Sequence, residues 1–567
     1  MNPKSILICG QAGQGIQSIG YILAKSFVRA GYYVFAWQDF QSRIRGGESS
    51  FRIVVDEKPV KSLTEKYDLI VSLDKENTKV YRALLKKDGL LVASPDTDDG
   101  NVYQIDFSKI ALKVVGKSLY TNAAATGAIA ALMDFPSEII RQVIMENFQG
   151  KGEDVISGNI RVYDAACQET SANYSGRKLI LGKPVATTNA TPDGKLLLTG
   201  IEALAIGAVA SGAKFIAAYP MTPSTGLITY LAETSHKTGI LAEQAEDEIS
   251  AINMAIGASY AGVRSLTATS GGGFCLMVEG LSLAAMTEVP IVIALGQRPG
   301  PATGLPTRTE QGELNFALSA GHGEFPRFIF APSDAISGYN MMLKAFDLSQ
   351  KYRVPSIILY DQYIADSYWT VDKEKIKTPE LKNYYTDPQN IVGEFRTFQI
   401  TDDGISPRLY PGQSRHTVIV DSDEHDEYGH ITENLETRKI MVEKRWKKFP
   451  AMEKEMGVHL PEDIDSAEII LISWGSNAGP SDAAAKIIRE KGINVQTVNY
   501  VDIWPLAVPE IFKKTSAKIA AVENNYTGQF ARLLESHGVP IEKKILKYNG
   551  LPFTAEEIAQ ETIKWLS

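Results

Sequence analysis

Three polar side chains in the middle of the chain follow apolar runs typical of buried strands, a common place for groups that act on a ligand. The first is Thr222, which lies in AAYPMTPSTG between Pro220 and Pro223, after the run KFIAA. Because proline fixes its own backbone torsion φ, two prolines hold the intervening backbone, and with it the threonine hydroxyl, in one orientation. The spacing predicts a rigid turn that presents a hydroxyl group.

The second side chain, Glu246, belongs to ILAEQAEDEISAINMAIG, where a strand gives way to a helix. Ile249, Ile252 and Ile256 are expected to share one face of that helix, which places Glu246 at its entrance and Glu248 in its first turn. Partial burial of Glu246 is expected, because the helix is rich in Ala and Gly, and a buried carboxylate needs a partner. The alternative is an ordinary preference of acids for helix N-termini.

The third side chain, Arg298, follows the strand-like run PIVIALG and precedes a rigid loop rich in Pro and Gly. Its guanidinium group could bind a carboxylate through two parallel hydrogen bonds, with Arg308 as the competing candidate. Between Glu246 and Arg298, TATSGGGF places Gly271–Gly273 between a strand and a helix. Glycines there would let a flat ligand lie against the backbone, although a plain tight turn explains them equally well.

Two motifs near the N-terminus are typical of anion binding. GQAGQG, with Gly10, Gly13 and Gly15, would let backbone amides approach a phosphate, but its spacing differs from the dinucleotide fingerprint GxGxxG. A tight turn is the alternative. Arg43 and Arg45 precede two glycines in SRIRGGES, which suits a phosphate or a carboxylate. A hairpin whose surface arginines pair with nearby acids is the alternative for this second motif.

Composition excludes several functional classes. The 567 residues carry a net charge of −9, which argues against an extended nucleic-acid surface. No run of about 18 uncharged apolar residues exists, so no membrane span is expected. The apolar run at the start is too short for a signal peptide. Cys9, Cys167 and Cys275 form no CxxC pair, which suits a reducing cytoplasm and argues against an iron–sulfur cluster held by this chain alone. The histidines within 416–430 fit no zinc-binding spacing, so no metal site is predicted.

Strand and helix patterns alternate along most of the chain, which predicts an α/β protein with three parallel-sheet domains. The expected order is a domain at 1–175, a linker at 176–195, a second domain at 196–368, a charged connecting arm at 369–464 and a last domain at 465–567.

The motifs YPMTP, QAEDE, TSGGGF and QRPGPATGLPT, in this order, resemble the pyrimidine-binding domain of the 2-oxoacid:ferredoxin oxidoreductases. GQAGQG and SRIRGGESSFR resemble the gamma domain of that family, and ILISWGSNAG and AVENNYTGQF resemble its transketolase-C-like domain. The whole chain is thus similar to a fused gamma–alpha subunit, of the type that acts on 2-oxoglutarate.

The resemblance implies a role for each of the three central residues. Thr222 would lie beside the aminopyrimidine ring of thiamine diphosphate and the bound 2-oxoacid. Glu246 would share a proton with a ring nitrogen of that pyrimidine, and Arg298 would pair with the substrate carboxylate. By the same resemblance, the residues expected to contact the cofactor are Tyr219, Pro220, Met221, Thr222, Pro223, Glu246, Gly271, Gly272, Gly273 and Phe274.

The resemblance also implies a partner. The GDG motif with which thiamine enzymes bind diphosphate and magnesium is missing from the sequence, as are the cysteines of a cluster. A separate beta subunit would therefore supply Mg²⁺ and a [4Fe-4S] cluster in an α2β2 assembly. The implied reaction converts a 2-oxoacid, coenzyme A and oxidised ferredoxin into acyl-CoA, CO2 and reduced ferredoxin, or runs in reverse. Arg43, Arg45, Asn524 and Asn525 are expected to receive coenzyme A.

Other functions stay open at the level of sequence. The same chemistry could act on pyruvate or on branched-chain or aryl 2-oxoacids. A thiamine enzyme that needs no partner, an oxidoreductase that binds a nicotinamide or flavin at GQAGQG, and a non-catalytic scaffold are the alternatives from other classes.

Overall fold

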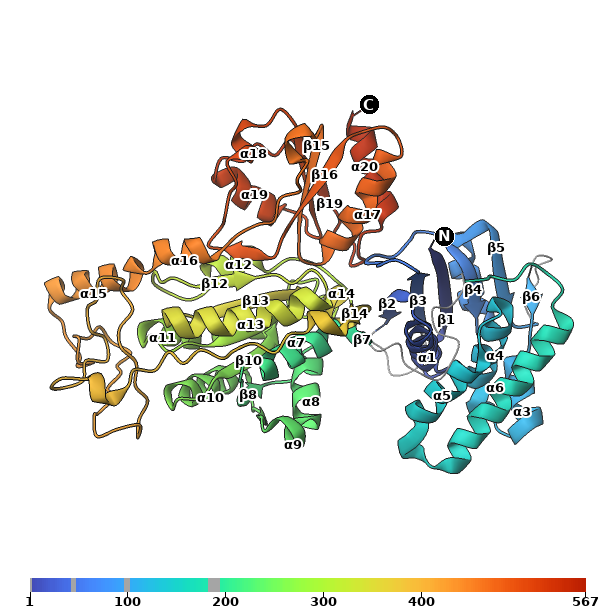
Figure 1. Cartoon of the computed structure of the whole chain (residues 1–567), viewed down its shortest axis with the longest axis horizontal. Helices are drawn as coiled ribbons and strands as arrows, with labels where there is room; N and C mark the ends of the chain where they lie inside the picture. Colours follow the sequence, from blue (N-terminus) through green and yellow to red (C-terminus); the bar gives the residue numbers. More distant parts are fainter. Residues whose placement is uncertain (1–2, 42–46, 96–101, 182–193, 567) are drawn as a thin grey trace. The chain divides into compact units, whose positions relative to one another are not determined.

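The computed structural model describes residues 3–41, 47–95, 102–181 and 194–566. The chain forms two compact units, one made of residues 1–199, 366–376 and 554–556, and the other of residues 200–365, 377–553 and 557–567. Within the described ranges, no helix combines the length and the apolar character needed to cross a membrane. The predicted α/β class is confirmed, because helices alternate with strands in three sheets (Figure 1).

The first unit contains an eight-stranded sheet. Its strands are, in spatial order, β6 (Tyr103–Gln104), β5 (Leu85–Ala93), β4 (Tyr67–Ser72), β1 (Lys4–Gln11), β3 (Glu48–Asp56), β2 (Tyr33–Phe40), β14 (Ser367–Asp372) and β7 (Lys195–Thr199). Its helices are α1 (Ile16–Arg29), α2 (Lys75–Tyr81), α3 (Phe107–Val115), α4 (Thr121–Met133), α5 (Ser137–Phe148) and α6 (Glu153–Asn173).

This sheet is mixed, whereas the sequence predicts a largely parallel one. β1 pairs parallel with β4, but β3 pairs antiparallel with both β1 and β2. Only residues 41–47 separate β2 from β3, and a parallel connection needs a dozen or more residues to cross back. The short connection therefore dictates the antiparallel pair. β14, from much later in the chain, pairs antiparallel with β2 and β7.

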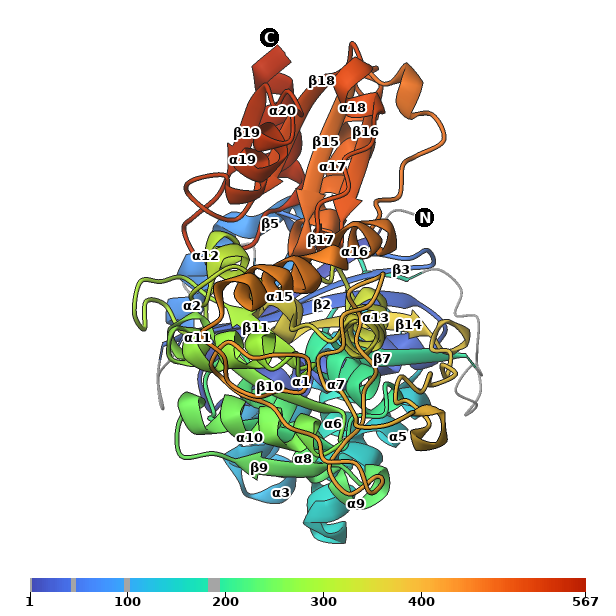
Figure 2. The same ribbon diagram turned by 90° about the vertical axis from the view of Figure 1, so that its left-hand side faces the viewer.

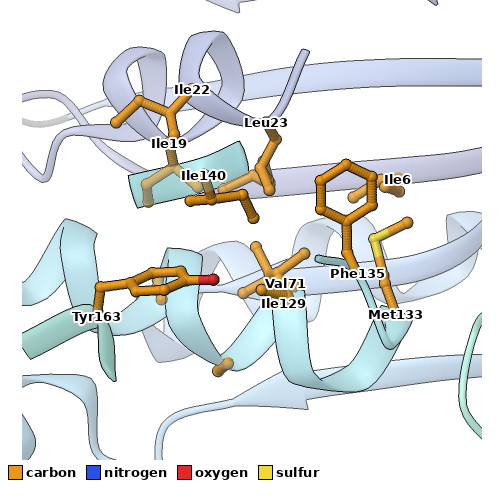
Figure 3. Packing of buried hydrophobic residues seen from close by; sticks show 14 of the residues in the cluster. Ile6, Ile19, Ile22, Leu23, Val71, Ile129, Met133, Phe135, Ile140 and Tyr163 are labelled. Atoms are coloured by element: carbon orange, nitrogen blue, oxygen red, sulfur yellow. The ribbon is translucent and has the colours of Figure 1, made fainter. Parts of the chain in front are cut away.

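The core of the first unit lies between this sheet and its helices. The apolar face of α1 is formed by Ile16, Ile19, Leu23 and Phe27, which are all buried. Ile19 and Leu23 of α1, Ile6 and Val71 of the sheet, and Ile129 and Ile140 of α4 and α5 belong to one cluster (Figure 3).

The second unit contains a seven-stranded sheet. Its strands are, in spatial order, β17 (Asp502–Trp504), β12 (Phe328–Phe330), β13 (Ser356–Asp361), β11 (Val292–Gln297), β10 (Ser265–Ser270), β8 (Phe215–Ala218) and β9 (Leu241–Gln244). The helices along this part of the chain are α7 (Gly200–Ala210), α8 (Thr225–Glu233), α9 (Ser235–Thr238), α10 (Glu248–Tyr260), α11 (Gly271–Met286), α12 (Leu314–Ser319), α13 (Ala335–Tyr352) and α14 (Gln362–Asp366). Neighbouring strands from β12 to β9 are parallel, and only β17 pairs antiparallel.

A four-stranded parallel sheet completes the second unit (Figure 2). Its strands are β16 (Val495–Tyr500), β15 (Ile469–Trp474), β18 (Lys518–Glu523) and β19 (Lys543–Leu546). The helices of this C-terminal part are α17 (Ala478–Arg489), α18 (Ile511–Lys514), α19 (Gln529–Ser536) and α20 (Ala555–Leu566). One continuous buried core joins the two sheets of this unit, from Ile293 and Leu359 to Ile470, Trp474 and Phe530.

The connecting arm is largely irregular, as its charged sequence predicts. Residues 377–434 contain neither a strand nor an α-helix, and α15 (Leu435–Lys447) and α16 (Phe449–Glu455) follow them. Lys444 and Lys448 both pair with the carboxylate of Glu288, and all three side chains are buried. This buried ion cluster ties the arm to the end of α11.

Candidate active site

The predicted site residues gather at the carboxyl edge of the seven-stranded sheet. Thr222 follows β8, Glu246 follows β9, Gly271 follows β10 and Arg298 follows β11, and these strands are neighbours in the order β11–β10–β8–β9. Open parallel sheets bind their ligands at this edge, because the loops that follow parallel strands all emerge there.

Thr222 and Arg298 are in direct contact. The Nη1 atom of Arg298 donates a hydrogen bond of 2.7 Å to the backbone carbonyl oxygen of Thr222. The peptide bond between Thr222 and Pro223 is cis. The proline ring lies against Gly296 of β11, where an added Cβ would come within 2.7 Å of the Pro223 Cγ. The YPMTP turn is therefore held both by its prolines and by the end of β11.

The remaining YPMTP residues line the outer side of this turn. Tyr219 is 40% exposed, and Pro220 and Met221 are half-buried. The backbone N–H of Ser224 donates to the carbonyl oxygen of Met221 at 2.8 Å, which closes the turn.

The acidic QAEDE segment differs from the prediction. Glu246 is exposed, so the expectation of partial burial is wrong, and Ile249 is 50% exposed rather than on the buried face. Asp247 caps α10 by accepting a hydrogen bond of 2.7 Å from the N–H of Ser250. Glu248 is the buried acid, at 3% exposure, and its Oε1 has no hydrogen-bond partner in the described part of the chain.

Helical geometry explains which acid is buried. Glu248, Ile252 and Ile256 are four residues apart, so they share one face of α10, and all three are buried. Ile249 lies three residues before Ile252 and fits the same helical period, so the sequence alone does not choose between Glu248 and Ile249 for the buried face.

The glycine run packs closely against acidic side chains. An added Cβ on Gly273 would lie 2.4 Å from Oε1 of Glu248, and one on Gly271 would lie 2.5 Å from Oε1 of Glu313. Gly272 is exposed, with open space around it. Phe274 is fully buried and packs edge-on against Phe316 at 5.2 Å, which gives its ring a packing role. Its place among the cofactor contacts stays a prediction.

Glu313, just before α12, is a site residue that sequence reasoning missed. Its Oε2 is enclosed and, like Oγ of Ser270, forms no hydrogen bond with any described residue. Burial and the neighbouring Glu310 raise the pKa of Glu313 to about 8, against the opposing effect of Arg298. No local pattern marks Glu313, because its position depends on a long loop folding back over α11.

Arg298 keeps its charge in this setting. Burial lowers the pKa of its guanidinium group, and Glu313 acts in the opposite direction. Guanidinium groups do not deprotonate in proteins, so Arg298 remains a cation that can bind an anionic group. The competing Arg308 packs against Gly550 of the C-terminal part instead.

The residues predicted to receive coenzyme A fall into two groups. Arg43 and Arg45 lie outside the described residues. Asn524 and Asn525 are buried and hydrogen-bonded within the chain: the N–H of Asn524 donates to Oε1 of Gln311 at 3.0 Å, and Nδ2 of Asn525 donates to the Gln311 carbonyl oxygen at 3.1 Å. These asparagines hold the segment that leads to Glu313, and their assignment to coenzyme A stays a prediction.

Two family models match the chain. Residues 206–444 match the model described as pyruvate flavodoxin/ferredoxin oxidoreductase, thiamine diphosphate-binding. Residues 5–169 match the model described as pyruvate ferredoxin/flavodoxin oxidoreductase. The order of the two matches agrees with the expected gamma–alpha arrangement.

Similar proteins extend the match over the full length. The 2-oxoacid:ferredoxin oxidoreductase subunit alpha of Saccharolobus solfataricus is 33% identical, over 98% of this chain and 96% of its own length. The 2-oxoglutarate synthase subunit KorA of Methanocaldococcus jannaschii is 30% identical, over 65% of this chain and 98% of its own length. The solved 2-oxoglutarate:ferredoxin oxidoreductase from Magnetococcus marinus superposes with a TM-score of 0.91 at 28% identity, covering 100% of both chains. The predicted resemblance is thus confirmed, and the chain belongs to the 2-oxoacid:ferredoxin oxidoreductases as a fused, alpha-type subunit.

Proposed function

We propose that this chain binds the pyrimidine half of thiamine diphosphate and the 2-oxoacid in an enzyme that oxidatively decarboxylates 2-oxoglutarate to succinyl-CoA. The observation that carries the proposal is the guanidinium group of Arg298, which is fixed on Thr222 at a sheet edge that also holds Glu248. The choice of 2-oxoglutarate is supported by the Magnetococcus marinus structure, which holds 2-oxoglutarate, coenzyme A and succinyl-CoA, and by the KorA relatives.

The residues present fit the pyrimidine end of the cofactor. Oε1 of Glu248 is buried and lacks a partner among the described residues, so a ring nitrogen that carries a proton would satisfy it. Gly273 lies so close to this carboxyl group that an added Cβ would displace it, so the glycine lets the carboxyl group keep its position. When bound, thiamine diphosphate supplies the electron sink that loss of CO2 from a 2-oxoacid requires.

Each side chain of the site then has one task. Arg298 binds the carboxylate of the 2-oxoacid through the N–H groups that its contact with Thr222 leaves available. Thr222, on its rigid turn, orients the substrate with its hydroxyl group. Glu248 holds or releases a proton at the ring nitrogen, a task that a buried carboxyl performs better than the exposed Glu246. We therefore prefer Glu248 to Glu246 for this role.

A second subunit completes the proposed enzyme. Ile249, Met254 and Leu276, on α10 and α11, are between 41% and 50% exposed, which suits burial against a partner. That beta subunit would carry Mg²⁺, the diphosphate site and a [4Fe-4S] cluster, would reduce ferredoxin, and would form an α2β2 assembly in the cytoplasm. Arg43 and Arg45 of this chain would contact coenzyme A.

The test is an assay of the complex. The chain is co-produced with its beta subunit, and viologen reduction is measured with 2-oxoglutarate, pyruvate and a branched-chain 2-oxoacid, with and without coenzyme A. The highest kcat/KM is expected for 2-oxoglutarate, and only when both subunits are present. Turnover by this chain alone, or no reduction with any 2-oxoacid, would contradict the proposal. An unchanged KM for coenzyme A after replacement of Arg43 and Arg45 would remove these two residues from it.

A further inference from the structure

Glu313 lies beside the proposed substrate arginine but has no task in the function described above. Its carboxyl group lies against Gly271, the first residue of α11, where an added Cβ would come within 2.5 Å of Oε1. Its other oxygen, Oε2, is enclosed and unpaired among the described residues. The carboxyl group therefore lies at the start of α11, the helix that follows β10 between the strands that precede Thr222 and Arg298.

The backbone around Glu313 is fixed by other parts of the second unit. The N–H of Glu313 donates to Oε1 of Gln297, the last residue of β11, at 3.3 Å. The preceding carbonyl oxygen, that of Gly312, accepts a hydrogen bond of 2.8 Å from Nε2 of Gln529 in α19. These two contacts fix the backbone from which the side chain of Glu313 extends.

The charges that face Glu313 come from several elements. Burial and Glu310 in the preceding loop favour its neutral form and raise its pKa to about 8, whereas the backbone of Gly312 and Arg298 at the end of β11 favour its anion. The first turn of α11 has no charged side chain, and α19 contributes the neutral Gln529. From α10, Glu248 reaches Gly273, two residues beyond Gly271.

Arg298 and Glu313 do not neutralise one another. In the described part of the chain, Glu313 takes part in no ion pair, and the one hydrogen bond donated by Arg298 goes to Thr222. The guanidinium group of Arg298 therefore keeps N–H donors that are not hydrogen-bonded to the nearby carboxyl group of Glu313.

We propose that Glu313 is a positioning residue for substrate binding: as a neutral carboxylic acid it leaves the guanidinium group of Arg298 available to the 2-oxoacid, and as an anion it competes for it. This inference rests on the proposed function, because it takes Arg298 as the group that binds the substrate carboxylate. The neutral form predominates at pH 7 and the anion at pH 9, since the pKa of Glu313 is about 8.

The consequence is a KM that depends on pH through one side chain. About one tenth of a group with a pKa of about 8 is ionised at pH 7 and about nine tenths at pH 9, so the KM for the 2-oxoacid is expected to rise about tenfold between them. The value of kcat, which refers to the complex already formed, should change much less with the ionisation of Glu313.

The test measures KM and kcat for 2-oxoglutarate from pH 6.5 to 9.5 in the complex with the beta subunit. Glu313→Gln is expected to keep the wild-type KM at pH 7 within about twofold and to abolish its alkaline rise. Glu310→Gln is expected to move the rise to lower pH, because removing a like charge lowers the pKa of Glu313. An identical alkaline rise in wild type and Glu313→Gln, or no rise in wild type, would overturn the inference.

Two further measurements keep the outcomes separate. Thermal unfolding and size-exclusion chromatography show whether Glu313→Gln folds and assembles; if it does not, the shift in Glu310→Gln decides the question. Infrared difference spectra of this chain between pH 7 and pH 9 should show loss of a protonated carboxyl band that is absent from Glu313→Gln. If that band is lost as expected but no 2-oxoacid supports turnover, the proposed function fails, and with it the substrate role of Glu313. If Glu313→Gln and Glu310→Gln are both fully active with the wild-type pH profile, only the role of Glu313 is refuted and the proposed function stands.

Discussion

Arg298 donates a hydrogen bond from Nη1 to the backbone carbonyl oxygen of Thr222 at 2.7 Å, across 76 residues of sequence. The two residues follow β11 and β8, and β10 lies between these strands in the sheet. The contact therefore spans the end of β10, where α11 begins at Gly271. A substrate carboxylate bound by the remaining N–H groups of Arg298 would lie near the start of that helix.

Replacement of Arg298 should impair substrate binding, and the loss should be larger when the charge is removed together with the planar hydrogen-bonding geometry. Arg298→Lys keeps the charge but loses the planar fork, so kcat/KM for the 2-oxoacid should fall at least about tenfold. Arg298→Met also loses the charge and should cost about a hundredfold, the scale of a charged hydrogen bond. Steady-state viologen reduction measures both effects. Arg308→Lys is the control and should stay within about threefold of wild type; a loss as large as that of Arg298→Lys would shift the assignment to Arg308.

The two acids of the QAEDE segment should respond differently to the same change. Glu248→Gln removes a buried proton-holding group, so kcat should fall at least about a hundredfold. Glu246→Gln alters an exposed side chain and should leave kcat within about threefold of wild type. Single-turnover kinetics of the complex, with thermal unfolding to confirm folding, compare the variants. The reverse order of losses would return the role to Glu246.

Because the start of α11 is closely packed on one side only, replacement of neighbouring glycines there by alanine should have different effects on stability and activity. In Gly273→Ala the new Cβ would lie 2.1 Å from Oγ1 of Thr269 and 2.4 Å from Oε1 of Glu248, so the side chains must shift. Such overpacking costs about 1–3 kcal/mol and should lower both the Tm and kcat. Gly272→Ala meets no atom within 4 Å and should leave both nearly unchanged. Calorimetry and the viologen assay compare the two variants. Equal effects would show that the glycines at 271–273 are needed for backbone freedom rather than for the small volume of their side chains.

The buried carboxylate of Glu288 should make stability depend on pH. Burial acts to raise the pKa of Glu288, but Lys444, Lys448 and Arg353 outweigh it and hold the pKa well below the usual 4.5. Because the folded pKa is lower than the unfolded one, the stabilisation is complete above about pH 4.5 and is lost as the pH falls toward the folded value. Wild-type Tm should therefore decrease below pH 4.5.

Removal of that carboxylate should be costly at neutral pH. Glu288→Gln leaves two buried lysines without their partner, which destabilises a protein by about 3–5 kcal/mol. Thermal unfolding at pH 7 measures the loss, and the variant should lose less Tm than wild type on acidification. Glu510→Gln, which removes exposed ion pairs with Lys513 and Lys514, is the control and should change the Tm little. Similar losses in both variants would refute the anchoring role of Glu288.

Local patterns were sufficient for the elements that carry the site. The strands β8 and β11 are short apolar runs in the sequence, and each is followed by the turn that the next residues predict. Thr222 and Arg298 could be placed at strand ends from these runs alone. The placement succeeded because strand ends depend on a few consecutive residues.

Local patterns failed where burial depends on distant residues. Which of Glu246 and Glu248 is buried is decided by α11, whose Gly273 lies against the second acid. The antiparallel pairing of β2 with β3, and the entry of β14 into the first sheet, likewise depend on chain connections rather than on strand patterns. Asn524 and Asn525 resemble exposed loop residues in the sequence, but they are buried against Gln311.

The sequence by itself determined the α/β class, the order of the motifs and the family, because these depend on periodicity and on short runs of residues. Only the tertiary structure decided which carboxyl groups lie near Arg298 and which of them are sheltered from water. Burial and electrostatic interaction act through space, between residues such as Gly271 and Glu313 that lie 42 positions apart in the chain. A pattern confined to neighbouring residues does not contain that information.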